Sequence, residues 1–355
     1  MQMQTLRCQI RKDSGPEKKA PESFFRLEEQ GQPQKKGGRL PVRKKHICML
    51  VAVSGLLSLS GCGQSAKNTE EEVTIGVVTK SKSSEYWLSV CDGMEDAAEK
   101  YNVDVVILSP DAETEENVQK NMIRDLLKTD IQALAVSPIN SYDSETYVKA
   151  AREKGISVYA CDTPMEDSDV PYIGIDNEKL GYELGEKLAE ALNHEGNIGV
   201  IAGDFQQAGH RKRVAGFEKY MEKETGINIE MVRNGYSNMR VSQKDVDEIL
   251  TKYPDIDGIM TTSAVTALGL SEAVEGRGIS IVSVDAQEDA LKAVQDGQIV
   301  ALGAQSGYTI GYETIHYIVK DLQGEGTGED EILDSQVLTT ENIDAYIKED
   351  KYSSS

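Results

Sequence analysis

Short apolar runs alternate with helix-like segments from Val73 onward, and this alternation is the main structural signal of the chain. The runs are bounded by polar or turn residues, which is typical of strands buried on both faces of a sheet. Strands that alternate with helices indicate βαβ units, parallel sheets and right-handed crossovers. Strands are predicted over residues 73–78, 103–108, 133–136, 158–161, 198–201, 227–232, 256–260, 279–284 and 300–304.

The segments between these runs carry apolar residues at helical spacing. Leu180, Leu184, Leu188 and Leu192 recur every four residues and predict the buried face of one helix. Similar faces begin at Val90 and at Val118. Further helices are predicted near residues 208–223, 242–252, 265–275 and 288–296. The elements form two successive sets, so the sequence predicts an α/β fold of two doubly wound parallel-sheet lobes.

We expect the chain to cross between the lobes three times, through a multi-strand hinge. The predicted crossings lie near residues 174–177, 305–307 and 334–338. Short hinge segments can absorb a change in backbone angles while each lobe stays rigid. The expected N-terminal lobe is 73–174 plus 306–333, and the expected C-terminal lobe is 175–305 plus 334–349.

The segment ahead of the lobes has the organisation of a secretory signal. Basic residues precede an apolar run over 47–59, which is too short to span a bilayer comfortably. The tetrapeptide Leu59-Ser60-Gly61-Cys62 then resembles the lipobox of bacterial lipoproteins. That resemblance implies cleavage before Cys62, lipidation of its thiol and an extracytoplasmic protein tethered to the membrane. We interpret 1–61 as leader and lipoprotein signal peptide and 62–72 as a flexible tether; an ordinary signal peptide with a chance cysteine is the alternative.

The net charge of the chain limits the kinds of molecule that it can bind. The whole chain carries 38 Lys+Arg and 60 Asp+Glu, and residues 1–61 hold 12 and 5 of them, so 26 and 55 remain from Cys62 onward. This body therefore carries about 29 net negative charges, which repel phosphate backbones and anionic lipid headgroups. Nucleic acid is an unsuitable partner, and membrane contact has to come from the lipid anchor.

Few cysteines remain in the expected mature chain. Besides Cys62, these are Cys91 and Cys161. An oxidising compartment permits a disulfide between them, but two separate buried thiols is the preferred interpretation.

Polar and aromatic residues follow the predicted strands, at the edge where open α/β sheets bind ligands. No Gly-rich phosphate cradle, metal-spaced His/Cys/Asp cluster or Gly-x-Ser-x-Gly elbow stands there. His210 is the only histidine expected near this edge, and no base–nucleophile pair accompanies it. The sequence therefore predicts no cofactor, no metal ion and no enzymatic activity. The candidate ligand-binding residues are Ser84, Tyr86, Trp87, Asp162, Arg211, Ser263, Asp285 and Gln305.

This set of side chains suits a neutral sugar or polyol. Hydroxyl groups both donate and accept hydrogen bonds, so carboxylates such as Asp162 and Asp285 can accept while Arg211 donates through its planar fork. Tyr86 and Trp87 can cover the apolar C–H face of a sugar ring. Structural roles stay open as alternatives: Trp87 in the core, the two aspartates as turn or helix caps, and Arg211 as the partner of a glutamate on its own helix.

From Val73 to about Glu325 the chain resembles the sugar-binding proteins of ABC importers of the ribose/galactose type, which share their fold with the effector domains of LacI-type repressors. The resemblance is carried by Ser84, Tyr86 and Trp87 ahead of Asp92-Gly93, by Asp162, by the segment Arg211-Lys212-Arg213-Val214-Ala215-Gly216-Phe217, by Val284-Asp285 and by Gln305. It implies a type I periplasmic binding protein-like fold and a ligand clamped between the lobes. A repressor is excluded because a lipobox and an acidic linker stand where a basic helix-turn-helix would be needed.

Departures from the family pattern leave the ligand open. Thr163 stands where ribose binders usually carry arginine, Ser263-Ala264 replaces Asn-Asp, and Ser237 replaces an aromatic residue. The pocket is therefore expected to be roomier and less charged, for a monosaccharide, a related polyol or a furanose-like signalling molecule. The closed form would be presented to an ABC permease or, alternatively, to a sensor kinase, and a monomer suits a protein that must present both lobes.

Overall fold

The computed structural model describes residues 73–353. The predicted signal peptide, Cys62 and the tether lie outside these residues, so the predictions for them are not tested. Within residues 73–353, no helix combines the length and apolar character that a membrane span requires.

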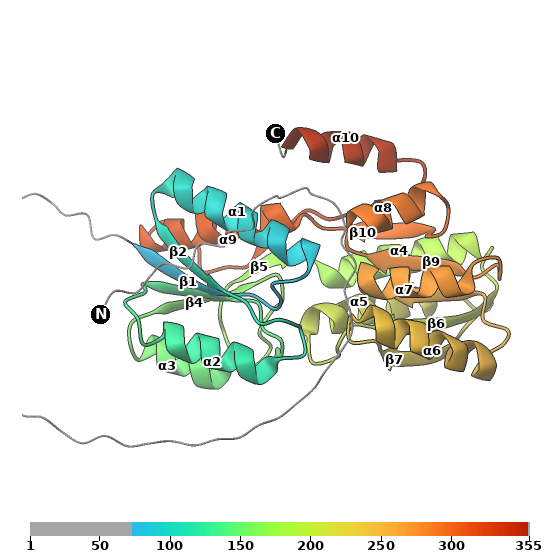
Figure 1. Cartoon of the computed structure of the whole chain (residues 1–355), viewed down its shortest axis with the longest axis horizontal. Coiled ribbons are helices and arrows are strands. Elements are labelled where there is room, and N and C mark those ends of the chain that lie inside the picture. Colours follow the sequence, from blue (N-terminus) through green and yellow to red (C-terminus); the bar gives the residue numbers. More distant parts are fainter. Residues whose placement is uncertain (1–72, 354–355) are drawn as a thin grey trace, which may run out of the picture. The chain divides into compact units, whose positions relative to one another are not determined.

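The first sheet has six parallel strands in the order β11-β5-β4-β3-β1-β2. Helices α1 and α9 cover one face of this sheet, and α2 and α3 cover the other (Figure 1). The strands are β1 (Thr74–Val78), β2 (Asp104–Leu108), β3 (Ala133–Val136), β4 (Ser157–Cys161), β5 (Tyr172–Ile175) and β11 (Glu331–Leu333). The helices are α1 (Glu85–Tyr101), α2 (Glu116–Leu126), α3 (Glu145–Arg152) and α9 (Gly307–Leu322).

The second sheet has the order β12-β10-β9-β8-β6-β7 and is parallel except at its edge, where β12 runs antiparallel to β10. The predicted α/β fold with two doubly wound lobes is confirmed. The strands are β6 (Gly196–Ala202), β7 (Ile227–Asn234), β8 (Gly258–Thr261), β9 (Ser280–Val284), β10 (Ala301–Ala304) and β12 (Gln336–Leu338). The helices are α4 (Asn177–Ala191), α5 (Ala208–Met221), α6 (Met239–Lys252), α7 (Ala264–Val274), α8 (Glu288–Gln295) and α10 (Ile343–Ser353).

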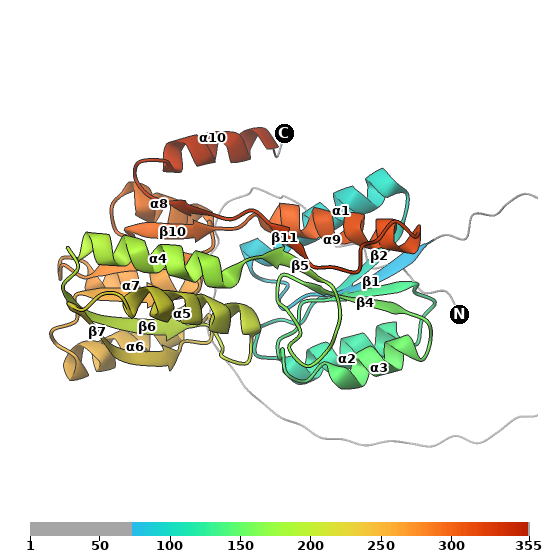
Figure 2. The ribbon, with the colours of Figure 1, turned by 180° about the vertical axis from the view of Figure 1, so that it is seen from behind.

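The chain passes between the two sheets after β5, after β10 and after β11 (Figure 2). Two of these crossings end in a helix N-cap. Asp176 accepts a hydrogen bond from the backbone N–H of Lys179 at 2.9 Å, and Ser306 accepts one from Thr309 at 3.1 Å. Each cap satisfies an N–H group that has no partner inside its helix, so it fixes where α4 and α9 begin.

Each lobe contains one helix pair that glycines bring into close contact. In the α4–α5 pair, a Cβ on Gly181 would lie 1.9 Å from the carbonyl oxygen of Arg213. In the α1–α9 pair, a Cβ on Gly311 would lie 1.9 Å from the carbonyl oxygen of Val90. No larger residue fits at such a distance, so these crossings fix how the N-termini of α1 and α5 are placed.

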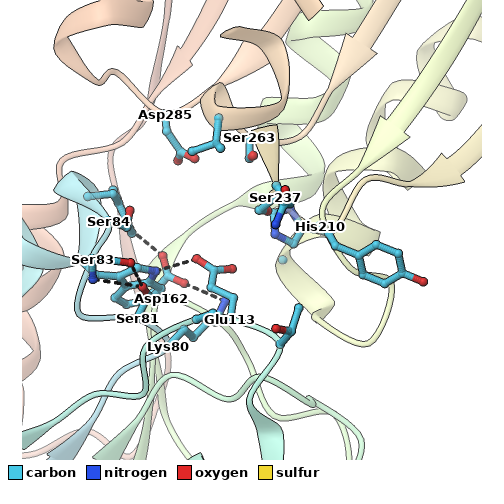
Figure 3. A pocket seen from close by; sticks show the side chains of 18 of the residues that line it. Lys80, Ser81, Ser83, Ser84, Glu113, Asp162, His210, Ser237, Ser263 and Asp285 are labelled. Carbon is cyan, nitrogen blue, oxygen red and sulfur yellow. Dashed lines mark hydrogen bonds and ion pairs between the residues drawn. The ribbon is translucent and has the colours of Figure 1, made fainter. Parts of the chain in front are cut away.

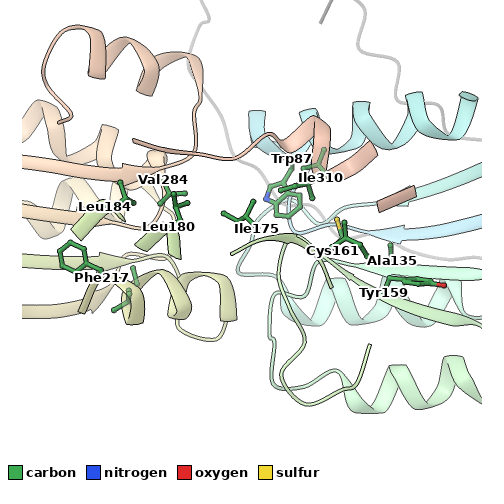
Figure 4. Close-up of a cluster of buried hydrophobic side chains, with 14 of the residues drawn as sticks. Trp87, Ala135, Tyr159, Cys161, Ile175, Leu180, Leu184, Phe217, Val284 and Ile310 are labelled. Carbon is green, nitrogen blue, oxygen red and sulfur yellow. The ribbon is translucent and has the colours of Figure 1, made fainter. Parts of the chain in front are cut away.

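One apolar cluster continues from the first lobe into the second (Figure 4). Trp87 and Ile310 belong to the first lobe, Leu180 and Phe217 to the second, and Ile175 lies between them. Burial of this apolar surface anchors the lobes to the hinge strands.

The two cysteines of residues 73–353 are not joined in a disulfide, and Cys91 is half-buried rather than buried as expected. Cys161 is buried at the end of β4 and accepts a hydrogen bond from Thr314 Oγ1 at 3.2 Å. Burial raises the pKa of the Cys161 thiol to about 12, so this thiol is unreactive at neutral pH.

Candidate functional site

A cavity of about 520 Å³ lies between the lobes, where the carboxyl ends of both sheets meet. Lys80, Glu113 and Asp162 line one side of it, and Ser263 and Asp285 line the other (Figure 3). The cavity therefore takes its walls from both lobes.

All but one of the predicted site residues line this cavity. They come from the start of α1, the ends of β4 and β9, the start of α7 and the crossing after β10. His210, which the sequence analysis places near the same edge, also lines it. The residues brought together as predicted are Ser84, Tyr86, Trp87, Asp162, Ser263, Asp285 and Gln305.

Arg211 requires a correction, because Arg213 occupies the place predicted for it. The Arg211 side chain is exposed, donates to the carbonyl oxygen of Phe205 at 3.3 Å and covers the ring of Tyr142. Arg213 is buried and lies one helical turn before Phe217, on the face of α5 that packs inward. Residues two apart on a helix point to nearly opposite sides, so only one of the two arginines can reach the cavity.

Protein partners fix the guanidinium of Arg213. Its Nε donates to Asn177 Oδ1 at 2.7 Å, and its Nη1 donates to the carbonyl oxygen of Thr262 at 2.9 Å. A guanidinium has five N–H donors in a planar fork, so these bonds orient the group and leave other donors for a ligand.

Asp162 and Asp285 occupy equivalent positions in the two lobes. Each follows the third strand from one edge of its sheet, β4 or β9, and each has a left-handed backbone, with φ of 63° and 81°. The N–H of Asp162 donates to Ile173 at 2.8 Å, and the N–H of Asp285 donates to Gly303 at 2.9 Å. A strained backbone that the neighbouring strand holds in place is a frequent feature of ligand sites. Here it directs two carboxylates into the cavity.

The first-lobe wall is a connected polar network. The Tyr86 hydroxyl donates to Asp162 Oδ1 at 2.6 Å, and the Thr163 hydroxyl donates to Asp162 Oδ2 at 2.7 Å. The buried ammonium of Lys80 donates to Thr163 Oγ1 at 2.6 Å and lies 3.4 Å from Asp162 Oδ2. The carboxylate is thus compensated by one cation and two hydroxyl donors.

Trp87 contributes less surface to the cavity than its sequence position predicts. Its side chain is 2% exposed, and its Nε1 donates to Glu113 Oε1 at 2.8 Å. Tyr86 packs against it edge-on at 5.2 Å between ring centroids and is the more exposed of the two rings. Of this pair, Tyr86 therefore offers the larger aromatic surface to a ligand.

The second-lobe wall offers hydrogen-bond acceptors. Gln305 Nε2 donates to Asp285 Oδ1 at 2.8 Å, while Gln305 Oε1 is a buried acceptor without a partner in the described structure. Burial raises the pKa of Asp285, and the nearby Arg213 only partly offsets this. The wall therefore contains buried acceptors that a ligand hydroxyl can satisfy.

His210 is a neutral member of the cavity wall. Burial, with Arg213 and Lys80 nearby, holds its pKa well below the usual 6.5. Its Nδ1 lies 2.8 Å from Thr262 Oγ1, and that hydroxyl accepts a hydrogen bond from the N–H of Gly203 at 2.7 Å. These contacts fix the imidazole ring against the Thr262 hydroxyl in the cavity wall.

Comparison with known proteins agrees with this geometry. Residues 75–326 match the family described as periplasmic binding protein domain. The chain belongs to this family. The ribose import binding protein RbsB of Bacillus subtilis is 24% identical over 279 residues, which cover 76% of this chain and 90% of RbsB. A xylitol-binding protein of Mycolicibacterium smegmatis is 26% identical over 322 residues, which cover 84% of this chain and 87% of that protein.

A solved structure shows the same fold. The carbohydrate transporter solute-binding protein of Agrobacterium radiobacter, crystallised with D-arabinose, aligns with a TM-score of 0.74 and 23% sequence identity. The alignment covers 78% of this chain and 98% of that one. This periplasmic binding protein therefore has the two-lobed architecture of its relatives over nearly their full length.

Lys80 and Glu113 are site residues that the sequence analysis missed. Lys80 comes two residues after β1 ends, and Glu113 lies in the loop between β2 and α2. Both residues follow the carboxyl end of a strand, and ligands bind at this edge of open α/β sheets. The reasoning that identified Asp162 could therefore have identified them too. Lysine and glutamate side chains are usually exposed, so the sequence alone gave little reason to place them in a ligand site.

Replacing Asp285 with Asn is expected to stabilise the binding protein at pH 7 while weakening ligand binding. The folded-state pKa of Asp285 is raised above the usual 3.8, so its ionisation costs stability as the pH rises through that pKa. Asn keeps the shape and abolishes this cost, so thermal unfolding at pH 7 should give a higher Tm than that of the wild type. A lower Tm at pH 7 would contradict the assignment.

The same variant loses a charged acceptor for ligand hydroxyls. Hydrogen bonds to charged groups contribute about 1.5–3 kcal/mol, so calorimetry with a sugar that binds the wild type should show at least about tenfold weaker affinity.

Proposed function

We propose that the protein captures a neutral monosaccharide or related polyol in the interlobe cavity and delivers it to the permease of an ABC importer. The main support for the proposal is that the second-lobe wall holds both buried hydrogen-bond acceptors and a buried donor of fixed orientation. Asp285 and Gln305 Oε1 can accept from hydroxyl groups, and Arg213 can donate to them. A hydroxyl-rich ligand satisfies all three groups, whereas an apolar ligand leaves them unpaired at a cost of about 1–3 kcal/mol each.

The charge balance supports a neutral ligand over an anion. Four carboxylates, those of Asp111, Glu113, Asp162 and Asp285, line the cavity with three cations, Lys80, Arg213 and Arg240. The carboxylates already compensate Lys80, which hydrogen-bonds within the protein. A sugar phosphate or sugar acid would therefore bring a second negative charge beside an excess of carboxylate.

Capture is expected to proceed by lobe closure about the three crossings. A ligand shifts the open–closed equilibrium only as far as it binds the closed form more tightly. Hydroxyl groups that reach both Asp162 in the first lobe and Asp285 in the second provide this difference. The importer then recognises the closed form.

The same proposal covers where the protein acts in the cell and how it is anchored. The protein acts outside the cytoplasm as a monomer, held at the membrane by a lipid on Cys62, and performs no chemistry on its ligand. The family membership supports the extracytoplasmic location, and the lipobox-like tetrapeptide supports the anchor.

A thermal-shift screen of the lobes, residues 73–355, tests the function. The panel is D-ribose, D-allose, D-arabinose, D-galactose and xylitol, with D-ribose 5-phosphate as the charged control. A ligand at 100 times its Kd should add about 2.7 kcal/mol of stability, which raises the Tm visibly. At least one neutral member should do so, and the phosphate should not. A rise with amino acids or nucleosides and with no sugar or polyol would contradict the proposal.

A further inference from the structure

Gln207 connects the two lobes directly behind the cavity. It precedes α5 in the second lobe, and its side chain is 1% exposed. Its Oε1 accepts from Lys80 Nζ at 2.7 Å, and its Nε2 donates to Glu113 Oε2 at 3.3 Å. Lys80 and Glu113 are first-lobe residues that line the cavity, whereas Gln207 does not line it. Its amide therefore supports two residues of the first-lobe wall from the second lobe.

Both groups that Gln207 holds also contact Trp87. Glu113 accepts the indole N–H through its other carboxylate oxygen, and Lys80 Nζ lies 5.4 Å from the centroid of the indole ring. The amide thus lies between the half-buried carboxylate of Glu113 and the buried ammonium of Lys80. Without it each of these charged groups loses a hydrogen bond, and buried networks that are only partly satisfied reorganise or admit water.

Contacts between the lobes surround Gln207. The N–H of Ser141 donates to the carbonyl oxygen of Gln206 at 2.9 Å, and Ser141 Oγ accepts from the N–H of Ala208 at 2.9 Å. Ser141 belongs to the first lobe and is fully buried. These bonds bracket Gln207 on both sides, so its amide reaches Lys80 and Glu113 only when the start of α5 is docked on the first lobe.

We propose that Gln207 is a positioning residue through which docking of the second lobe orders the charged wall of the first. The proposal rests on the proposed function for its consequence, which is that ligand affinity depends on a residue outside the cavity. Because Gln207 does not line the cavity, its loss weakens all ligands by a similar factor and leaves their relative order unchanged.

The test uses the only tryptophan of the chain, Trp87, and needs no sugar. Gln207→Leu keeps the approximate size of the side chain and removes both hydrogen bonds. Its Trp87 emission is expected to move to longer wavelength and to become more accessible to acrylamide. Gln206→Leu is the matched control, because Gln206 also bonds across the lobes, to Asn140 at 3.0 Å, but contacts neither Lys80 nor Glu113. The control should keep the wild-type emission.

Gln207→Glu is the second variant, in case Gln207→Leu fails to fold. It keeps an acceptor for Lys80 but repels Glu113, so it should also shift the Trp87 emission. With D-ribose and xylitol as probes, both variants should bind at least about tenfold more weakly, with the ratio of the two affinities within about twofold of wild type. Folded variants with unchanged emission and quenching would overturn the proposal. If neither probe nor any panel sugar binds the wild type, the proposed function fails, while the emission result still decides the role of Gln207.

Discussion

Arg213→Ala is expected to weaken sugar binding by about 100-fold or more, whereas Arg211→Ala should leave the affinity within about threefold of wild type. Arg213 is buried, oriented by Asn177 and Thr262, and lines the cavity. Its removal deletes a charge-assisted donor and leaves the Asp285 carboxylate without its nearby cation. Arg211 is exposed and contacts Tyr142 and Phe205.

The two arginine variants form a matched pair on one helix. Isothermal titration with the best ligand of the panel, at constant salt, gives both affinities, and circular dichroism checks that each variant is folded. The site assignment fails if Arg211→Ala produces the larger loss, or if Arg213→Ala is folded and binds like the wild type.

Gly181→Ala is expected to reduce the free energy of unfolding by about 3 kcal/mol, the upper part of the usual range for overpacking. A Cβ at this position would lie 1.9 Å from the carbonyl oxygen of Arg213. The obstacle is backbone, so no rotamer change can relieve it and α4 has to move away from α5. Because that displacement moves the backbone of Arg213 itself, ligand affinity should fall together with stability.

Gly209→Ala is the control for the helix pair. It lies on α5, and its added Cβ would meet its nearest neighbours at 3.7 Å, which is ordinary contact. Alanine is favoured over glycine inside a helix by up to about 1 kcal/mol, so this variant should be as stable as wild type or more so. Urea unfolding measures both. Equal stability of the Gly181 and Gly209 variants would contradict the inference that α4 and α5 are in close backbone contact at Gly181.

The sequence predicted the fold well because the central strands of both sheets are parallel and buried, and such strands appear in the sequence as continuous apolar runs. The strands it missed lack that signal. β5 is four residues long and contains Gly174, while β11 and β12 are three-residue edge strands in a charged segment. Such strands are fixed by their neighbours in the sheet rather than by their own composition.

The sequence predicted those site residues whose place at the end of a strand determines where their side chains point. Asp162 and Asp285 follow strands, so they had to emerge at the ligand edge of the sheets. The choice between Arg211 and Arg213 depends on how α5 is rotated, and the Gly216–α4 contact sets that rotation. Gln207 was beyond sequence reasoning, because its role arises only from contacts between the two lobes.

A crystal structure of the protein with the panel ligand that raises its Tm most tests the central claim directly. We expect one ligand enclosed between the lobes, with its hydroxyl groups bonded to Asp162 from one side and to Arg213 and Asp285 from the other. A ligand bound to one lobe alone, or outside this cavity, would contradict it.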